Sequence, residues 1–522
     1  MGHVGRKVGW HRAVFFPAAF ALFLPSFRTP AMLDDFVYFL WFDSTRWRHV
    51  ASLLDPRNGY IWIRPVATFL YYLEYQFTQE TMIGYRLAGI FWHAAIAVTV
   101  TVWVRRSLRQ TDSTAIAAGW LFLVHPAAVQ AVCYPSARGE QLFLLTGLWS
   151  LILFSDAATG RAGMRRAVIA GGGLLVLSLL SKETAVGWAV ILGLFLWIER
   201  PGLPTSNPIR IPCMTAGFIT GAYLVGRTTV MSGIGGYGWM SRSGLPPLRL
   251  AGESILWMIH VLPRAHFFPV SPGLHGIAPW METLTTALTI GIICLAMLRP
   301  NQWRFGIVSL GFLAVSQALV TAVFAGSDPD ILAPRYLYMG SVAVASVLAG
   351  LLVSANSADG GQPDTGNRWR RISVRLMLVI LVVAWTHAQI RFQRDFRHAG
   401  EITGAVLTLT EQLCNHLQSG GEIDIYHVPE RAGAFTIHIP SRTLSIFNLA
   451  GHRNCGLAVQ FNMAAGQDPE HWFRYMDDLP GRIGVTNKKP PNSALRSEST
   501  AIVPLVIDFA EMYPEFVDSE NH

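Results

Sequence analysis

Two adjacent carboxylates stand where the first long apolar segment ends. Asp34 and Asp35 follow segment 13–30 in the sequence TPAMLDDFVYFLW. A carboxylate at the mouth of a membrane helix can accept the proton of an attacking hydroxyl group, or it can bind a divalent cation. The same residues can also end one helix and cap the next. The sequence leaves these alternatives open, and Asp35 is the candidate ligand if there is a metal.

Further ionisable residues lie at boundaries between apolar segments. Lys182 and Glu183 stand together in LSLLSKETAVGW, and Arg138 and Glu140 stand close together in PSARGEQLF. Each pair is either a simple ion pair at a turn or part of a binding site. A lysine or arginine at headgroup depth is placed to hold the phosphate of an anionic lipid.

Two more arginines and a histidine occupy similar positions. Arg64 precedes segment PVATFLYYLEYQF, and Arg335 precedes Tyr336 and Tyr338 in APRYLYMG. Arg335 has the same two interpretations, an ion pair or a phosphate contact, and Arg64 is a further ionisable residue at a helix end. For His125 in LVHPAAV, a hydrogen bond to a backbone carbonyl near the following proline is favoured over metal binding.

Composition predicts that a membrane positions these residues. The chain has 522 residues, of which 51% are hydrophobic and only 14% are charged, whereas soluble domains have about 25% charged residues. Apolar runs of about 17 to 25 residues match a hydrocarbon core of about 30 Å. The net charge of +8 is scattered between these runs, which argues against nucleic-acid binding. The apolar runs include 13–30, 83–104, 167–181, 282–298, 305–325, 336–354 and 375–390.

Clusters of arginine and lysine predict the orientation, because short loops rich in these residues stay in the cytoplasm. If six such clusters face the cytoplasm, ten crossings precede the last cluster and 375–390 is the eleventh helix. Segment 251–270 then does not span the membrane. The N-terminus is predicted to be cytoplasmic, and all the candidate residues above fall at the outer ends of helices. The clusters are Arg6, Lys7 and Arg12; Arg105, Arg106 and Arg109; Arg161, Arg165 and Arg166; Arg200 and Arg210; Arg299 and Arg304; and Arg368, Arg370, Arg371 and Arg375.

The predicted architecture is an all-α polytopic membrane domain of about eleven helices followed by a small α/β domain outside the cytoplasm. The membrane domain covers 1–390, with a first outer loop at 31–82 that holds interfacial helices. The smaller domain covers 398–522, where a helical pattern precedes the strand-like alternations EIDIYHV and AFTIHI. Its Cys414 and Cys455 either form a disulfide or remain two buried thiols.

Five motifs in order resemble the transmembrane O-mannosyltransferase branch of the membrane-embedded GT-C glycosyltransferases and its bacterial relatives. The correspondence covers most of 12–390, but no period of about 34 residues indicates the tetratricopeptide repeats that many relatives carry. Glu140 replaces the Asp, and Gln130 the Glu, that relatives often have. The motifs are LDDFVYF; IRPVATFLYYLEYQF followed by GYRLAGIFWHAAIAV; LFLVHPAAVQAVCYPSARGEQLF; LLSKETAVGW; and APRYLYMGSVAV.

The resemblance implies inverting transfer of a sugar from a polyprenyl-phosphate donor to an acceptor hydroxyl at the outer face of a bacterial cytoplasmic (inner) membrane. The partners are then the lipid-linked donor, membrane lipid, and an acceptor that is a protein, lipid or glycan. No cofactor is certain, and a divalent cation stays open. The implied roles are Asp35 and Asp34 as base, Lys182, Arg138, Arg335 and Arg64 at the donor phosphate, and Glu183, Glu140, His125, Tyr336 and Tyr338 in support.

Two other functions fit a polytopic chain. A transporter or flippase of a lipid-linked substrate also needs charged residues within helices, but it usually places them near the membrane midplane between repeated halves. No inverted repeat is evident here. A catalytically silent homologue that serves assembly is the second alternative.

Overall fold

The computed structural model describes 12–32, 64–79, 81–199, 207–231, 303–324, 334–353 and 365–414, six strands, and the single positions 35, 38, 39, 42, 252, 255 and 291. The chain forms two compact units. Unit 1 contains Met1–Pro25, His49–Glu74 and Ile83–Phe392. Unit 2 contains Ser26–Arg48, Tyr75–Met82 and Gln393–His522.

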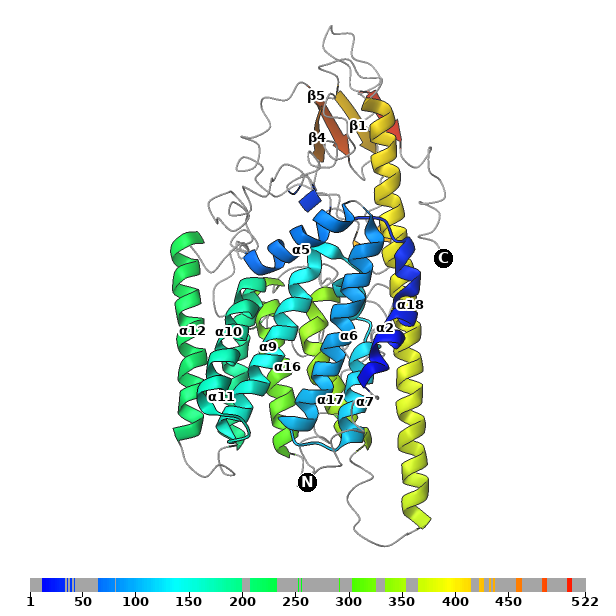
Figure 1. Cartoon of the computed structure of the whole chain (residues 1–522). Helices are drawn as coiled ribbons and strands as arrows, with labels where there is room; N and C mark the ends of the chain where they lie inside the picture. Colours follow the sequence, from blue (N-terminus) through cyan, green and yellow to red (C-terminus); the bar gives the residue numbers. More distant parts are fainter. Residues whose placement is uncertain are drawn as a thin grey trace. The chain divides into compact units, whose positions relative to one another are not determined.

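Unit 1 is built from helices (Figure 1). Within the described part of the chain, six helical segments are long and apolar enough to cross a membrane. The coarse prediction of a mostly helical membrane protein is therefore confirmed. Eleven crossings stay a prediction, because 251–270 and 282–298 lie almost wholly outside the described residues. The helices are α2 (Phe15–Phe23), α5 (Pro65–Thr78), α6 (Met82–Arg106), α7 (Asp112–Leu123), α8 (Ala128–Cys133), α9 (Arg138–Ala158), α10 (Met164–Ser181), α11 (Gly187–Glu199), α12 (Asn207–Met231), α16 (Trp303–Phe324), α17 (Tyr338–Val353) and α18 (Thr365–Cys414).

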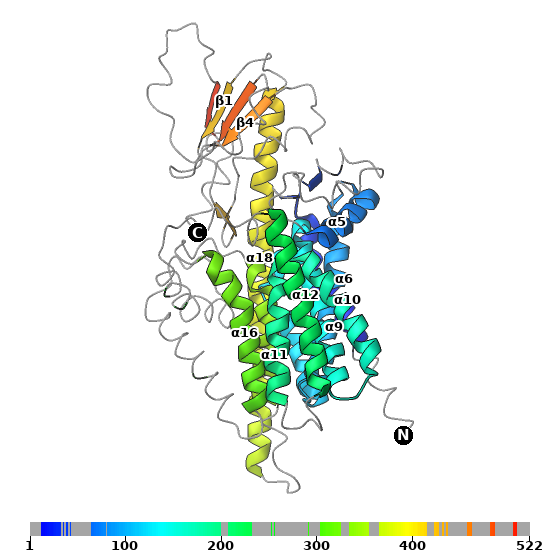
Figure 2. The ribbon, with the colours of Figure 1, turned by 90° about the vertical axis from the view of Figure 1, so that its left-hand side faces the viewer.

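Short 3-10 turns join several of these helices: η1 (Leu24–Arg28), η3 (Pro135–Ala137), η4 (Glu183–Val186) and η9 (Pro334–Leu337). Small residues let the helices approach closely. A methyl group at Gly147 of α9 would overlap the indole of Trp188 in α11, and one at Gly350 of α17 would overlap the ring of Phe305 in α16. Glycine at such contacts is typical of packed membrane helices. Figures 1 and 2 both show α12 beside α10 and α11.

Helix α18 differs from the sequence prediction. A membrane helix at 375–390 and a separate helical segment from Ala399 were expected, but the structure has one continuous helix of 50 residues. The prediction of two elements was wrong. Residues 391–414 contain no proline, so each backbone N–H in this stretch can continue the ladder of helical hydrogen bonds.

Unit 2 contains a parallel sheet with the strand order β4-β5-β1-β6. Strand β1 (Glu422–Tyr426) confirms the strand predicted from EIDIYHV, whereas AFTIHI supplies only the short β3 (Phe435–Thr436). That 398–522 is an independent domain stays a prediction, as does the disulfide, because Cys455 lies outside the described residues. The other strands are β2 (Arg431–Ala432), which pairs with β3, β4 (Leu457–Phe461), β5 (Gly481–Val485) and β6 (Leu505–Asp508).

Candidate functional site

Asp35 lies in unit 2 and is completely buried. Its Oδ2 accepts a hydrogen bond of 3.0 Å from the backbone N–H of Met32, and its own N–H donates to the Met32 carbonyl over 2.7 Å. A carboxylate that reaches back three residues to a backbone N–H is the arrangement found at the start of a helix. The geometry supports a capping role, and the role as base stays a prediction. Asp34 lies outside the described residues.

Several other candidate residues meet at one end of unit 1, where local structure positions them. Glu140 lies in the first turn of α9, where a carboxylate interacts favourably with the helix dipole. Lys182 has an extended backbone that separates α10 from η4. Arg64 precedes Pro65, the first residue of α5, which is a common place for proline. Arg335 lies in η9, directly before α17.

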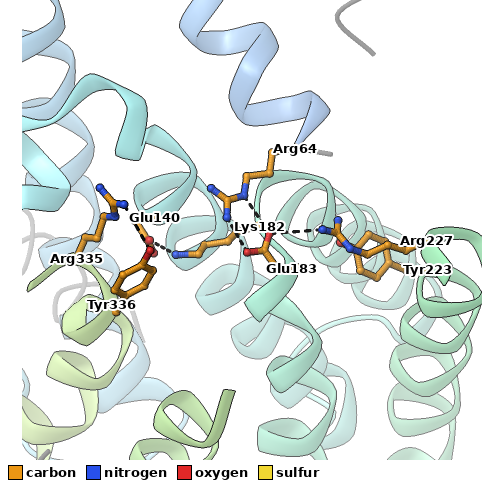
Figure 3. Close-up of polar contacts among 8 residues, drawn as sticks. All are labelled: Arg64, Glu140, Lys182, Glu183, Tyr223, Arg227, Arg335 and Tyr336. Carbon is orange, nitrogen blue, oxygen red and sulfur yellow. Dashed lines mark hydrogen bonds and ion pairs between the residues drawn. The ribbon is translucent and has the colours of Figure 1, made fainter. Parts of the chain in front are cut away.

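Lys182 is almost completely buried, with 2% of its side chain exposed, and it forms an ion pair with Glu140 (Figure 3). Its ammonium nitrogen lies 5.2 Å from the ring centre of Tyr336 and 5.8 Å from that of Phe143. Aromatic rings at this distance attract a cation. Lys182 lies between two apolar helical segments, and burial lowers its pKa, as does the positive charge of Arg64. The ammonium is thus held in a site that favours a nearby negative charge.

Glu183 faces the other way and holds two arginines. Its carboxylate accepts two hydrogen bonds from Arg64, of 3.0 Å from Nε and 2.6 Å from Nη2. Nη2 of Arg227 lies 4.0 Å from Glu183 Oε2, while Nη1 of Arg227 donates to the hydroxyl of Tyr223 over 3.0 Å. Two parallel bonds fix the orientation of an arginine more firmly than a single contact does. Arg64 is therefore the more tightly held of the two.

Arg335 lies against aromatic rings. Its guanidinium carbon is 5.2 Å from the ring centres of both Tyr134 and Tyr336. The backbone N–H of Arg335 donates to Oε1 of Gln130 over 3.2 Å. Gln130 stands where relatives often have Glu, and its side chain here binds the backbone N–H of Arg335. A guanidinium group is planar and weakly hydrated, so it both packs against aromatic rings and suits recognition of phosphate oxygens.

We call these six side chains the charge cluster: Arg64, Glu140, Lys182, Glu183, Arg227 and Arg335. It contains four cations and two carboxylates, so within these six residues two positive charges are in excess. Buried charge is unfavourable unless an opposite charge accompanies it. Lysine and arginine side chains of this kind are those that proteins place beside anionic groups such as phosphates.

Arg138 makes a different set of contacts, with only 1% of its side chain exposed. Its Nε and Nη2 donate to Glu74 Oε2 over 3.2 and 2.9 Å, Nη1 donates to Gln141 Oε1 over 2.5 Å, and Nη2 also donates to the Tyr85 carbonyl over 3.0 Å. These bonds join α5, α6 and α9. An ion pair between Arg138 and Glu140 was one of the two interpretations left open by the sequence, and the structure instead pairs Arg138 with Glu74 and Glu140 with Lys182. The contacts support a structural role, and a phosphate contact stays a prediction.

His125 and Tyr338 lie in well-packed surroundings. Nδ1 of His125 accepts a hydrogen bond of 3.1 Å from the Ala127 N–H, and its ring packs edge-on against Trp385. This partner is an N–H, and the expected hydrogen bond to a carbonyl stays a prediction. The Tyr338 hydroxyl donates to Nδ1 of His93 over 2.7 Å, because His93 Nε2 donates to the Leu123 carbonyl over 3.0 Å. Within the described residues, no group of three or more His, Cys, Asp or Glu is placed to hold a metal.

The sequence analysis missed Arg227, Glu74 and His93. Arg227 stands inside the apolar stretch GAYLVGRTTVM of α12, and an arginine within a membrane helix indicates a functional site by default. That signal was available from sequence. His93 gave the same kind of signal, because it is an ionisable residue inside the apolar helix α6. The partners of Glu74 and His93 were not predictable, since each is met only through packing between distant helices.

Sequence comparison finds a known relative for part of the chain, although no family model matches it. Over 133 residues it is 31% identical to a protein O-mannosyl-transferase of Caenorhabditis elegans. The chain resembles the transmembrane O-mannosyltransferases. This match agrees with the resemblance inferred from the motifs, but it covers 25% of the chain and 18% of the relative. The known O-mannosyl-transferase is therefore matched over less than a fifth of its length.

Solved structures show distant likeness. The archaeal oligosaccharyltransferase AglB of Archaeoglobus fulgidus, in complex with an inhibitory peptide and a dolichol-phosphate, has a TM-score of 0.45 at 11% identity, covering 80% of this chain and 62% of that one. ArnT of Cupriavidus metallidurans, bound to undecaprenyl phosphate, has a TM-score of 0.44 at 13% sequence identity. The match covers 85% of this chain and 88% of ArnT. The mycobacterial arabinofuranosyltransferase AftD has a TM-score of 0.46 at 14% sequence identity. The match covers 83% of this chain and 31% of AftD.

Proposed function

We propose that the chain is a membrane-embedded glycosyltransferase that moves a sugar from a polyprenyl-phosphate donor to an acceptor hydroxyl. The observation that carries this proposal is the charge cluster, in which four cations, two of them buried, accompany two carboxylates. Negative charge develops on the lipid phosphate as the bond to the sugar breaks. Fixed cations beside that phosphate stabilise the transition state more than the ground state. The local identity with an O-mannosyl-transferase supports a sugar as the transferred group.

The reaction divides into two tasks that different parts of the chain perform. In the inverting reaction, the acceptor oxygen attacks the anomeric carbon from the side opposite the phosphate, and its proton passes to a base. Asp34 and Asp35 are the candidate bases, and the hydrogen bond from Met32 fixes the Asp35 carboxylate. Lys182 and Arg335 are the cations assigned to the leaving phosphate, and Arg64 orients Glu183 behind them.

The topology belongs to the same proposal. The charge cluster is assigned to the outer face of a bacterial cytoplasmic membrane, with the N-terminus inside. Residues 398–522 are then exposed outside the cytoplasm, in the compartment where the acceptor is met. The acceptor is a protein, lipid or glycan hydroxyl. The parallel order of β4, β5, β1 and β6 is compatible with an α/β fold for this segment.

The test compares two cations at opposite ends of α10. Lys182 follows the last residue of this helix, and Arg165 stands in its first turn and is exposed. Proteoliposomes are supplied with radiolabelled polyprenyl-phosphate mannose and an extract of acceptors, and both donor binding and sugar transfer are measured. Lys182→Ala is expected to weaken donor binding by about tenfold or more and to slow transfer, because a charge-assisted contact of about 1.5 to 3 kcal/mol is lost. Arg165→Ala is expected to behave as wild type.

The outcome also separates the alternatives. Wild-type donor binding and transfer by Lys182→Ala would contradict the proposed site. Movement of the labelled donor between leaflets without cleavage of the sugar–phosphate bond would instead support a transporter of a lipid-linked substrate.

A further inference from the structure

A second group of arginines lies at the far end of α6. A cavity of about 340 Å³ is lined by Arg12, Val102, Arg105 and Arg106. Tyr85 marks the end of α6 near the charge cluster, because its carbonyl accepts a hydrogen bond from Arg138. Arg105 lies twenty residues further along the same helix. At a rise of 1.5 Å per residue this separation is about 30 Å, which is the thickness of a bilayer core. The cavity is therefore distinct from the site of the proposed reaction.

Carboxylates satisfy two of the three arginines in this cavity. Arg105 forms an ion pair of 2.5 Å with Asp112, which lies in the first turn of α7. Arg106 forms a pair of 2.9 Å with the buried Asp156, and Asp156 is shared with a further arginine, Arg161. Asp112 and Asp156 thus serve Arg105, Arg106 and Arg161 through these ion pairs.

Arg12 is the third arginine of the cavity, and the two ion pairs above do not include it. Its Nε is buried and has no hydrogen-bond partner in the described part of the chain. Burial lowers the pKa of Arg12, and the positive charge of Arg105 lowers it further, while Asp112 acts in the opposite direction. A bound anion would satisfy the Nε–H and would offset the repulsion between the two arginines.

We propose that the cavity formed by Arg12, Val102, Arg105 and Arg106 binds a phosphate-bearing anion. A volume of about 340 Å³ is within the range of small-ligand sites. Guanidinium groups match phosphate oxygens through paired hydrogen bonds. Anion binding in this cavity does not involve the residues of the proposed transfer reaction, so it can be tested without measuring sugar transfer.

Neighbouring apolar residues favour a membrane phospholipid as the source of this phosphate. Helix α2 begins three residues after Arg12; Phe16 and Phe20 are exposed along it, as is Val14 directly before it. Phe16 packs against Phe91 of α6, with ring centres 5.5 Å apart, so exposed apolar surface continues between the two helices. A headgroup in the cavity would leave its acyl chains beside this surface. Basic pockets between membrane helices hold anionic headgroups in this way.

The test measures binding to the purified full chain in detergent by calorimetry. The probes are dihexanoyl phosphatidylglycerol, inorganic phosphate and, as a zwitterionic comparison, dihexanoyl phosphatidylcholine. Arg12→Gln is expected to weaken binding of the anionic probe by about tenfold or more. Arg12→Lys keeps the charge without the planar fork, so it is expected to bind with intermediate affinity. Arg165→Gln removes one positive charge from a residue that does not line the cavity, and it is expected to bind as wild type.

Each outcome decides between the sources or against the site. Binding of phosphatidylglycerol without competition from phosphate supports a lipid headgroup, and equal binding of inorganic phosphate supports a soluble anion. Wild-type affinity in Arg12→Gln, or no binding of either anion by the wild type, overturns the proposal. If Arg12→Gln does not fold, Val102→Phe keeps all three arginines and fills the cavity, so it must weaken binding to the same degree.

Discussion

The two ends of α9 both carry ion pairs, but in different surroundings. At its beginning, the side chain of Arg138 is 1% exposed. Glu140 there pairs with Lys182, whose side chain is 2% exposed. At its end, the buried Asp156 binds Arg106 and Arg161, whose side chains are 46% and 34% exposed. Eighteen residues separate Arg138 from Asp156, or about 27 Å along the helix. One helix thus has buried ion pairs at its beginning and partly exposed ion pairs at its end.

This difference shows where charge is retained for a reason other than stability. A pair with one well-exposed partner contributes about 0 to 1 kcal/mol and mainly places positive charge at the membrane boundary. Buried ion pairs can often be replaced by apolar residues without loss of stability. We therefore propose binding or catalysis as the role of the buried pair of Lys182 and the partly buried pair of Arg64, whereas the exposed partners of Asp156 need no such role.

The largest effect on stability is expected from Arg138→Met. The substitution leaves Glu74 and Gln141 buried without their main partner, which costs about 3 to 5 kcal/mol of folding free energy. Thermal denaturation in detergent measures the loss. The double variant Arg138→Met with Glu74→Leu is expected to recover most of it, because no unpaired charge remains. A single variant as stable as wild type would show that the first end of α9 does not depend on this pair.

A large effect on function with a smaller effect on stability is expected from Arg64→Gln. Glu183 loses two hydrogen bonds, of 2.6 and 3.0 Å, and the charge cluster loses one cation. Donor binding should weaken about 10- to 100-fold, since bonds to charged groups contribute about 1.5 to 3 kcal/mol. Titration with a fluorescent polyprenyl phosphate checks this value. Unchanged affinity would assign Arg64 to structure alone.

Arg227→Gln is expected to have a smaller effect than Arg64→Gln. The Arg227 guanidinium lies 4.0 Å from Glu183 and also bonds to Tyr223, so its contribution to the carboxylate is weaker and longer in range. The same titration should give a loss of about threefold to tenfold. Equal losses in the two variants would mean that both arginines contact the donor directly.

The smallest effect is expected from Arg106→Gln at the other end of α9. Its side chain is nearly half exposed, and Arg161 remains as a partner of Asp156. Unfolding free energy should change by about 1 kcal/mol or less, and donor binding should not change. Thermal denaturation and the donor titration together test this control. Loss of donor affinity would remove the contrast between the two ends.

Sequence reasoning found most members of the charge cluster but not their pairing. Arg64, Lys182 and Arg335 were found because ionisable residues at the ends of apolar segments are rare and costly. Their partners depend on helix packing across long stretches of chain, such as the 119 residues between Arg64 and Glu183. No local pattern encodes such a contact, so the sequence offered only an ion pair between sequence neighbours as one of two open interpretations.

The fold was predictable to a similar extent. Apolar length predicted α6, α10 and α17, because hydrophobicity over about 20 residues is sufficient for a membrane helix. The continuous α18 was not predicted, since its polar half looked like a separate element. For Asp35 the capping interpretation was already available from sequence, and the bond to Met32 supports it without testing a role in proton transfer.

Sugar transfer by the Asp34→Asn and Asp35→Asn variants tests the proposed function most directly. Asparagine keeps nearly the same shape and an oxygen that accepts the Met32 N–H, so folding and donor binding should persist within about 1 kcal/mol. Loss of the base should slow release of labelled polyprenyl phosphate in proteoliposomes about 100- to 10,000-fold in at least one variant. Near wild-type transfer by both variants, with normal donor binding, would contradict the proposed mechanism.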